Sequence, residues 1–122
     1  MLALSTLTPR RATKAAVQPP DLTKAAYAYL ARYSASSAHL RLVLTRRLRR
    51  WARLNNAEAT PHLPLVDQAV AACARNGLLD DAAYAANRAA MLRQRGWPWR
   101  RIAAALNAGG LSRDEVAEAL RR

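Results

Sequence analysis

The chain of 122 residues has room for one compact domain or two small helical units, and its apolar runs are far shorter than the roughly 20 residues of a membrane-spanning helix. The net charge of +12 indicates a polyanionic partner. Alanine, leucine and arginine dominate while glycine and β-branched residues are sparse, so the composition predicts an all-α protein.

Residues 1–20 contain basic residues but no acidic ones, among serine, threonine and proline. This composition is typical of a disordered basic tail. A transit peptide is the alternative, because such segments are also basic and poor in acids.

Residues 21–77 predict three helices. Asp21 is the expected N-cap of the first, and a serine is expected to cap the second and longest. The predicted apolar face of the second helix comprises Leu40, Val43, Leu44, Leu48, Trp51 and Leu54. Residues 55–64 are expected to form a loop, and the third helix is expected to end at Gly77.

The sequence of residues 78–122 predicts three more helices. Asp80 or Asp81 is expected to cap the fourth. The apolar side of that helix is expected to carry Tyr84, Met91 and Leu92. Pro98 is predicted at the first position of the fifth helix, where its missing N–H costs nothing. Ser112, with a glutamate three residues later, predicts a capping box for the sixth.

The two halves share one plan, in which a tyrosine-bearing helix, an arginine-rich helix and a shorter helix follow one another. This similarity predicts a tandem repeat of three-helix units, residues 21–77 and 78–122. Repeats this small can scarcely bury a helix face alone, so we expect about six helices stacked into an elongated, curved array. Two unrelated helical trios would give the same pattern.

No catalytic, cofactor-binding or metal-ligating residue is predicted. His39 and His62 share no metal-ligand spacing with each other or with Cys73, and the glycines stand at helix ends rather than in a phosphate loop. Cys73 lies in an apolar stretch, so we expect a buried core residue in a protein from a reducing compartment. The serines cluster where helices start, which capping explains; a Ser-His-Asp site is the alternative.

The second predicted helix carries the first candidate binding surface. On a helical wheel Arg46, Arg49 and Arg53 cluster opposite Leu44 and Trp51, and no acid interrupts the run. These arginines are expected to contact DNA phosphates or an acidic protein surface. A solvated polar face without a partner is the alternative.

A second basic cluster surrounds the turn at Gly96. Its arginines are Arg93, Arg95, Arg100 and Arg101, of which we expect Arg93, Arg100 and Arg101 to contact DNA or a partner. The neighbouring Trp97 and Trp99 are expected either to stack on single-stranded bases or, as hydrophobic contacts, to fix the entry of the next helix. Arg88 is expected to form a structural ion pair.

Two series of short motifs resemble the RecX family of regulatory proteins. The first comprises residues 29–34, Ser36-Ser37, residues 40–44 and Arg46-Arg47. The second comprises residues 76–81, Tyr84-Ala85, Arg88, Arg95-Gly96, Ile102, Leu106, Gly110-Leu111 and Ala119-Leu120. The order and spacing of these motifs over residues 26–120 carry the resemblance.

The resemblance implies a cytoplasmic protein that lies along the RecA recombinase filament and modulates, usually by inhibition, its ATPase and strand exchange in recombination and DNA repair. Family members typically have three such repeats, and this chain has room for two. No enzyme activity, small-molecule substrate or membrane is expected. A sequence-tolerant DNA-binding protein with helix-turn-helix geometry around Gly109 and Gly110 is the main alternative; a structural protein of an organelle is another.

Overall fold

The computed structural model describes residues 17–122, and most of the predicted tail lies outside these residues. Within them the chain forms six α-helices and one short 3₁₀-helix, and no strand. The helices are α2 (Leu22–Arg32), α3 (Ser37–Leu54), η1 (Thr60–His62), α4 (Pro64–Arg75), α5 (Asp81–Gln94), α6 (Trp99–Ala108) and α7 (Arg113–Arg121). The predicted all-α fold is confirmed.

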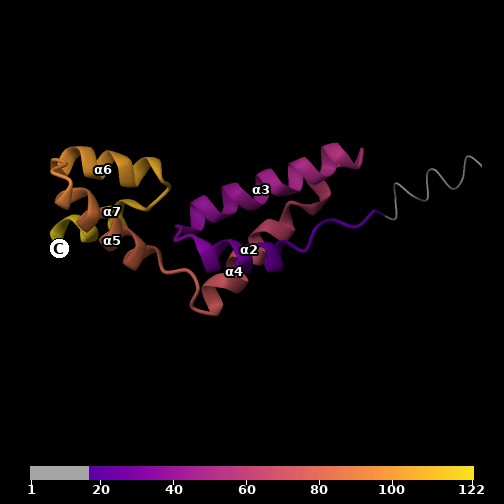
Figure 1. Cartoon of the computed structure of the whole chain (residues 1–122), viewed down its shortest axis with the longest axis horizontal. Coiled ribbons are helices and arrows are strands. Elements are labelled where there is room, and N and C mark those ends of the chain that lie inside the picture. The colour runs from indigo at the N-terminus through magenta and orange to yellow at the C-terminus, as the bar shows by residue number, and fades with distance from the viewer. Residues whose placement is uncertain (1–16) are drawn as a thin grey trace, which may run out of the picture.

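The helices form two groups that follow one another along the long axis of the molecule (Figure 1). We call α2, α3 and α4 the first trio and α5, α6 and α7 the second trio. Helix α2 packs chiefly against α4, and α5 packs chiefly against α7. All the extensive helix–helix contacts lie within a trio. The result is the elongated helical array that the sequence predicts, and the common origin of the trios stays a prediction.

The core of the first trio is built on leucines of α3 spaced four residues apart, Leu40, Leu44 and Leu48. Each contributes roughly 1.5–3 kcal/mol by leaving water. The opposing surface of α4 includes the buried Cys73, as predicted, and this burial raises the pKa of its thiol. The N-cap predicted for α2 is also confirmed, since the side chain of Asp21 accepts from the Lys24 N–H.

The predicted apolar face of α3 is wrong at its end, where Leu54 is 74 % exposed. The buried positions advance in steps of four and reach Ala52, and two residues further on a helix the side chain points to the opposite side. Trp51 is half-buried against the core, with its ring edge-on to His62. The loop predicted over residues 55–64 is shorter than expected, because it contains η1 and α4 begins at Pro64.

Alanines line the core of the second trio on α5. Ala85, Ala89 and Leu92 face the other two helices, so Met91, predicted on the apolar side, is 41 % exposed. The ion pair predicted for Arg88 is not formed among residues 17–122. Arg88 is only partly buried, because it lies at the edge of the buried face of α5 rather than within it.

The start of α6 differs from prediction by one residue. Pro98 is the N-cap, with extended backbone, and the helix begins at Trp99. At α7 the predicted capping box is present: the Glu115 N–H donates to Ser112 Oγ (3.1 Å), and the Ser112 N–H donates to Glu115 Oε1 (2.8 Å).

The trios meet at the amino end of α3. The Ser36 hydroxyl caps α3 and donates to the Gly109 carbonyl (3.3 Å), while the Ser37 N–H donates to the Asp81 carboxylate (2.8 Å). Gly110 has φ +88°, and a Cβ there would lie 2.4 Å from that of Ala38. This junction sets the relative orientation of the two basic surfaces described next.

Candidate polyanion-binding surface

Arg46, Arg49 and Arg53 lie on the solvent side of α3, and we call them the α3 arginine face. All three are exposed, and within residues 17–122 none forms an ion pair. Only Arg41 of this helix is neutralised, by Asp67 at 2.9 Å. Helix α3 has 18 residues and no acid, so an unneutralised basic surface runs along part of a helix about 27 Å long.

Hollows flank the α3 arginine face on both sides. One, of about 480 Å³, is lined by Arg49, Arg53 and the segment 56–60 that leads to η1. The other, of about 320 Å³, is lined by Arg47 and Arg50 beside Trp51 and Leu54. Because arginines line both, extended anionic groups can lie against the helix and reach more than one guanidinium.

The second basic group lies where α5 turns into α6, and we call residues 93–101 the α5–α6 corner. The Arg101 guanidinium lies 3.7 Å from the Trp97 ring centroid, and that of Arg100 lies 5.2 Å from the Trp99 ring centroid. Both are cation–π contacts. The two tryptophans differ in environment: Trp97 packs against the core of the second trio, whereas Trp99 is 62 % exposed.

Arg93 is the predicted contact residue whose guanidinium donates hydrogen bonds to the backbone of another helix. Its Nη2 donates to the carbonyl oxygens of Ala119 (3.2 Å) and Leu120 (3.0 Å), at the end of α7. A cation there satisfies carbonyls that a helix end leaves free and complements the helix dipole. Sequence reasoning missed this contact because its acceptors are backbone atoms, which no residue type marks.

The predicted site residues therefore fall into two groups. The carboxyl half of α3 and the α5–α6 corner lie toward opposite ends of the described array (Figure 1). In α7 Glu118 forms ion pairs with Arg121 and Arg122, and the hydrogen bond and charge of Arg121 lower the pKa of Glu118. The basic groups thus keep their charge while α7 is largely balanced.

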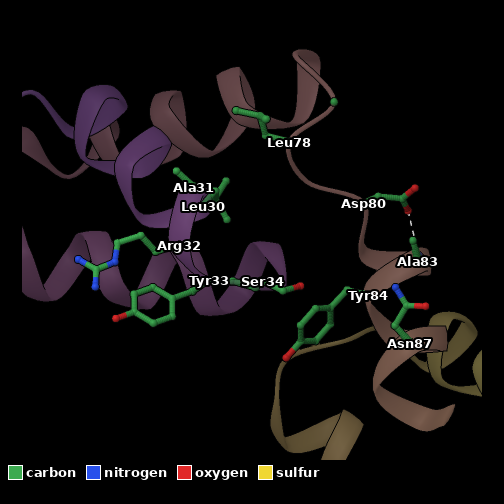
Figure 2. A pocket seen from close by; sticks show the side chains of 12 residues that line it. Leu30, Ala31, Arg32, Tyr33, Ser34, Leu78, Asp80, Ala83, Tyr84 and Asn87 are labelled. Atoms are coloured by element: carbon green, nitrogen blue, oxygen red, sulfur yellow. Dashed lines mark hydrogen bonds between the residues drawn. The ribbon is translucent and has the colours of Figure 1, made fainter. Parts of the chain in front are cut away.

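An open cleft of about 380 Å³ separates the end of α2 from the start of α5. Figure 2 shows Tyr33 and Tyr84 on opposite walls and the Asp80 carboxylate accepting from the Ala83 N–H at 3.0 Å. Of the two acids predicted to cap α5, Asp80 and Asp81, Asp80 is the N-cap. Tyr33 is 52 % exposed. The cleft depends on the junction between the trios, so no local sequence pattern marks it.

The described residues contain neither a candidate metal site nor a candidate membrane-spanning helix. Residues 17–122 contain no group of three His, Cys, Asp or Glu side chains placed to hold a metal ion. Over the same residues, no helix combines the length and apolar character needed to cross a membrane.

These features define a small, basic, all-helical protein with two exposed arginine surfaces. The chain is 40 % identical over 110 residues to regulatory protein RecX of Myxococcus xanthus (strain DK1622), in an alignment that covers 90 % of the chain and 58 % of that relative. This similarity supports the resemblance to the RecX family that the motifs predict, and the chain spans less than two thirds of this relative's length. No family model and no solved structure matches the chain.

Proposed function

We propose that this protein binds the RecA recombinase filament in the cytoplasm and lowers its ATPase and strand-exchange activities in recombination and DNA repair. It acts by binding rather than as an enzyme, and it uses no cofactor or small-molecule substrate. The observation that carries the proposal is the unpaired α3 arginine face, together with the relationship to a regulatory protein.

The electrostatics of the array suit a filament. The α3 arginine face and the α5–α6 corner provide two separate points of attachment on one elongated body. A nucleoprotein filament presents DNA phosphates and acidic protein surface repeatedly along its axis, so two separated contacts bind more tightly than one. A molecule lying across neighbouring subunits would oppose the movements that hydrolysis and strand exchange require.

The direct test is single-stranded-DNA-dependent ATP hydrolysis by RecA of the same organism, titrated with this protein at near-physiological salt. A basic peptide of matched charge is the control. We expect hydrolysis to fall at substoichiometric protein and to be unaffected by the peptide. No change in hydrolysis, despite measurable DNA binding, would contradict the proposal.

A triple variant tests the surface itself. Replacing Arg46, Arg49 and Arg53 by alanine should abolish most of the inhibition while leaving the helical circular dichroism unchanged, because all three side chains are exposed. The matched control replaces Arg75, Arg121 and Arg122, which removes the same charge elsewhere. Equal inhibition by the two variants would show that net charge, and not this face, is responsible.

The alternative is a sequence-tolerant DNA-binding protein without a recombinase partner. Helices α6 and α7 are joined by residues 109–112, a length that helix-turn-helix proteins also use. Against it, α7 would be the recognition helix, and Asp114, Glu115 and Glu118 would repel phosphates. The alternative requires naked duplex to be bound as tightly as the filament, which parallel titrations measure.

A further inference from the structure

Trp99 is a large apolar side chain that the fold leaves in solvent. Its neighbour Trp97 contributes to the core of the second trio, so the packing of this corner is complete without Trp99. Trp99 is also the one exposed large apolar residue of α6. The fold does not need this exposed indole, so its face is free to contact a ligand.

The surroundings of Trp99 are positively charged. Residues 82–113 include six arginines and no acid. Within the described chain Arg95, Arg100 and Arg101 form no ion pair, and the first turn of α6 has neither an acidic residue nor a side-chain cap. A ligand at this corner must therefore bring negative charge.

An anionic ligand that also offers flat aromatic surfaces is a single-stranded nucleic acid. In a duplex the bases stack on one another and their faces are covered, whereas an unpaired base can stack on an aromatic side chain. Arg100 lies against the Trp99 ring, where it can hold a phosphate next to a stacked base. Tryptophan and arginine are also enriched at protein interfaces, so contact of Trp99 with a protein is an outcome that the test below distinguishes.

We propose that the α5–α6 corner binds single-stranded DNA, with the Trp99 indole stacking on an unpaired base and Arg100 and Arg101 holding the flanking phosphates. This inference deepens the proposed function, on which it rests for its biological setting. It assigns the two basic groups different ligands. The aromatic ring beside the α3 arginine face, Trp51, is half-buried against the core, whereas Trp99 is exposed.

The test uses the full chain without RecA and measures fluorescence anisotropy of three labelled ligands: a short oligodeoxythymidylate, an abasic oligonucleotide of equal length, and a blunt duplex. Trp99→Ala should weaken oligodeoxythymidylate binding roughly tenfold, since stacking on one base contributes about that factor. Binding of the abasic strand and the duplex should be unchanged. Trp99→Phe should retain most of the affinity. Leu78→Ala, which removes an exposed apolar side chain outside both basic groups, should have no effect.

Two results would overturn the proposal. If Trp99→Ala weakens all three ligands equally, or none, no base stacks on the indole. If the variant binds oligodeoxythymidylate normally but no longer inhibits RecA, Trp99 contacts protein instead. Failure of the proposed function is separate: wild-type protein would then bind the oligonucleotide through Trp99 and leave ATP hydrolysis by RecA unchanged.

Discussion

Both trios consist of three helices, but they differ in the side chains that form the core and in the charged residues on the surface. In the first, α3 supplies a leucine at every fourth position to the core, while in the second α5 supplies alanines. Residues 21–77 contain nine basic and three acidic residues, against eight and five in residues 78–122. The first trio therefore carries the larger excess of positive charge.

The difference shows how one plan can present two kinds of surface. The length of α3 spreads its arginines along a helix whose one tryptophan, Trp51, is half-buried against the core. In the second trio the sharp turn between α5 and α6 gathers arginines and tryptophans at one place, and the acids are confined largely to the helix amino ends and α7. Helix length and turn position, rather than charge alone, distinguish the two surfaces.

The largest expected effect comes from truncating either core. Leu48→Ala and Leu92→Ala should each lower the free energy of unfolding by about 3 kcal/mol, because both side chains are fully buried and leave a cavity. Since the trios share few contacts, Leu48→Ala should lower the urea midpoint reported by Trp51 more than that reported by Trp97 and Trp99.

Single-site fluorescence separates the trios in that experiment. Trp51→Phe leaves the probes of the second trio, and the double replacement of Trp97 and Trp99 by phenylalanine leaves Trp51. Equal shifts of the urea midpoint at both probes would mean that the trios unfold as one unit. The two trios would then differ in their surfaces but not in their stability.

The next effect concerns the junction. Gly110→Ala should destabilise the protein by about 2–3 kcal/mol, because it combines a left-handed backbone with a Cβ placed 2.4 Å from that of Ala38. Gly96→Ala is the control, since its φ is +85° but nothing lies within 4 Å of the added Cβ. It should cost about 1 kcal/mol. Equal losses in thermal unfolding would show that the contact with Ala38 does not constrain the junction.

A smaller effect separates the two basic surfaces by salt dependence. Replacing Arg46, Arg49 and Arg53 by alanine should weaken duplex binding roughly tenfold and flatten the plot of log affinity against log salt by about 2–3. Replacing Arg100 and Arg101 should flatten the duplex plot less, because this corner favours unpaired strands. Titrations at several salt concentrations measure both slopes, and identical slopes would contradict the division of roles.

The smallest effect is expected at Asp81. Asp81→Asn removes the charge from the hydrogen bond to the Ser37 N–H and should lower stability by about 1 kcal/mol. Asp114→Asn is matched, because it also removes an acid from the first turn of a helix but makes no bond between trios. A urea titration that finds equal losses would assign the effect of Asp81 to the helix dipole alone.

Local patterns predicted most of the fold. Every predicted helix is present, because apolar spacing and caps such as Asp21 and Ser112 act within one or two turns. The errors at Leu54 and Met91 arise because periodicity shows that a face is apolar but not where the neighbouring helices end or how closely they approach.

The sequence also predicted which residue types form the candidate site, and it left their surroundings open. It could not distinguish Trp97 from Trp99, because only Pro98 separates them in the sequence and only packing partly buries one of them. Nor could it assign Arg93, whose acceptors at Ala119 and Leu120 are brought to it by the packing of α5 on α7.

The sequence by itself determined the helices, their caps, the resemblance to RecX proteins and the positive charge, since these depend on residue order and composition. Only the tertiary structure decided that Ser36 and Ser37 join the trios through Gly109 and Asp81, and that the two basic groups lie toward opposite ends of the array. The physical reason is that both features depend on contacts between atoms far apart in the chain, which form only when the helices pack.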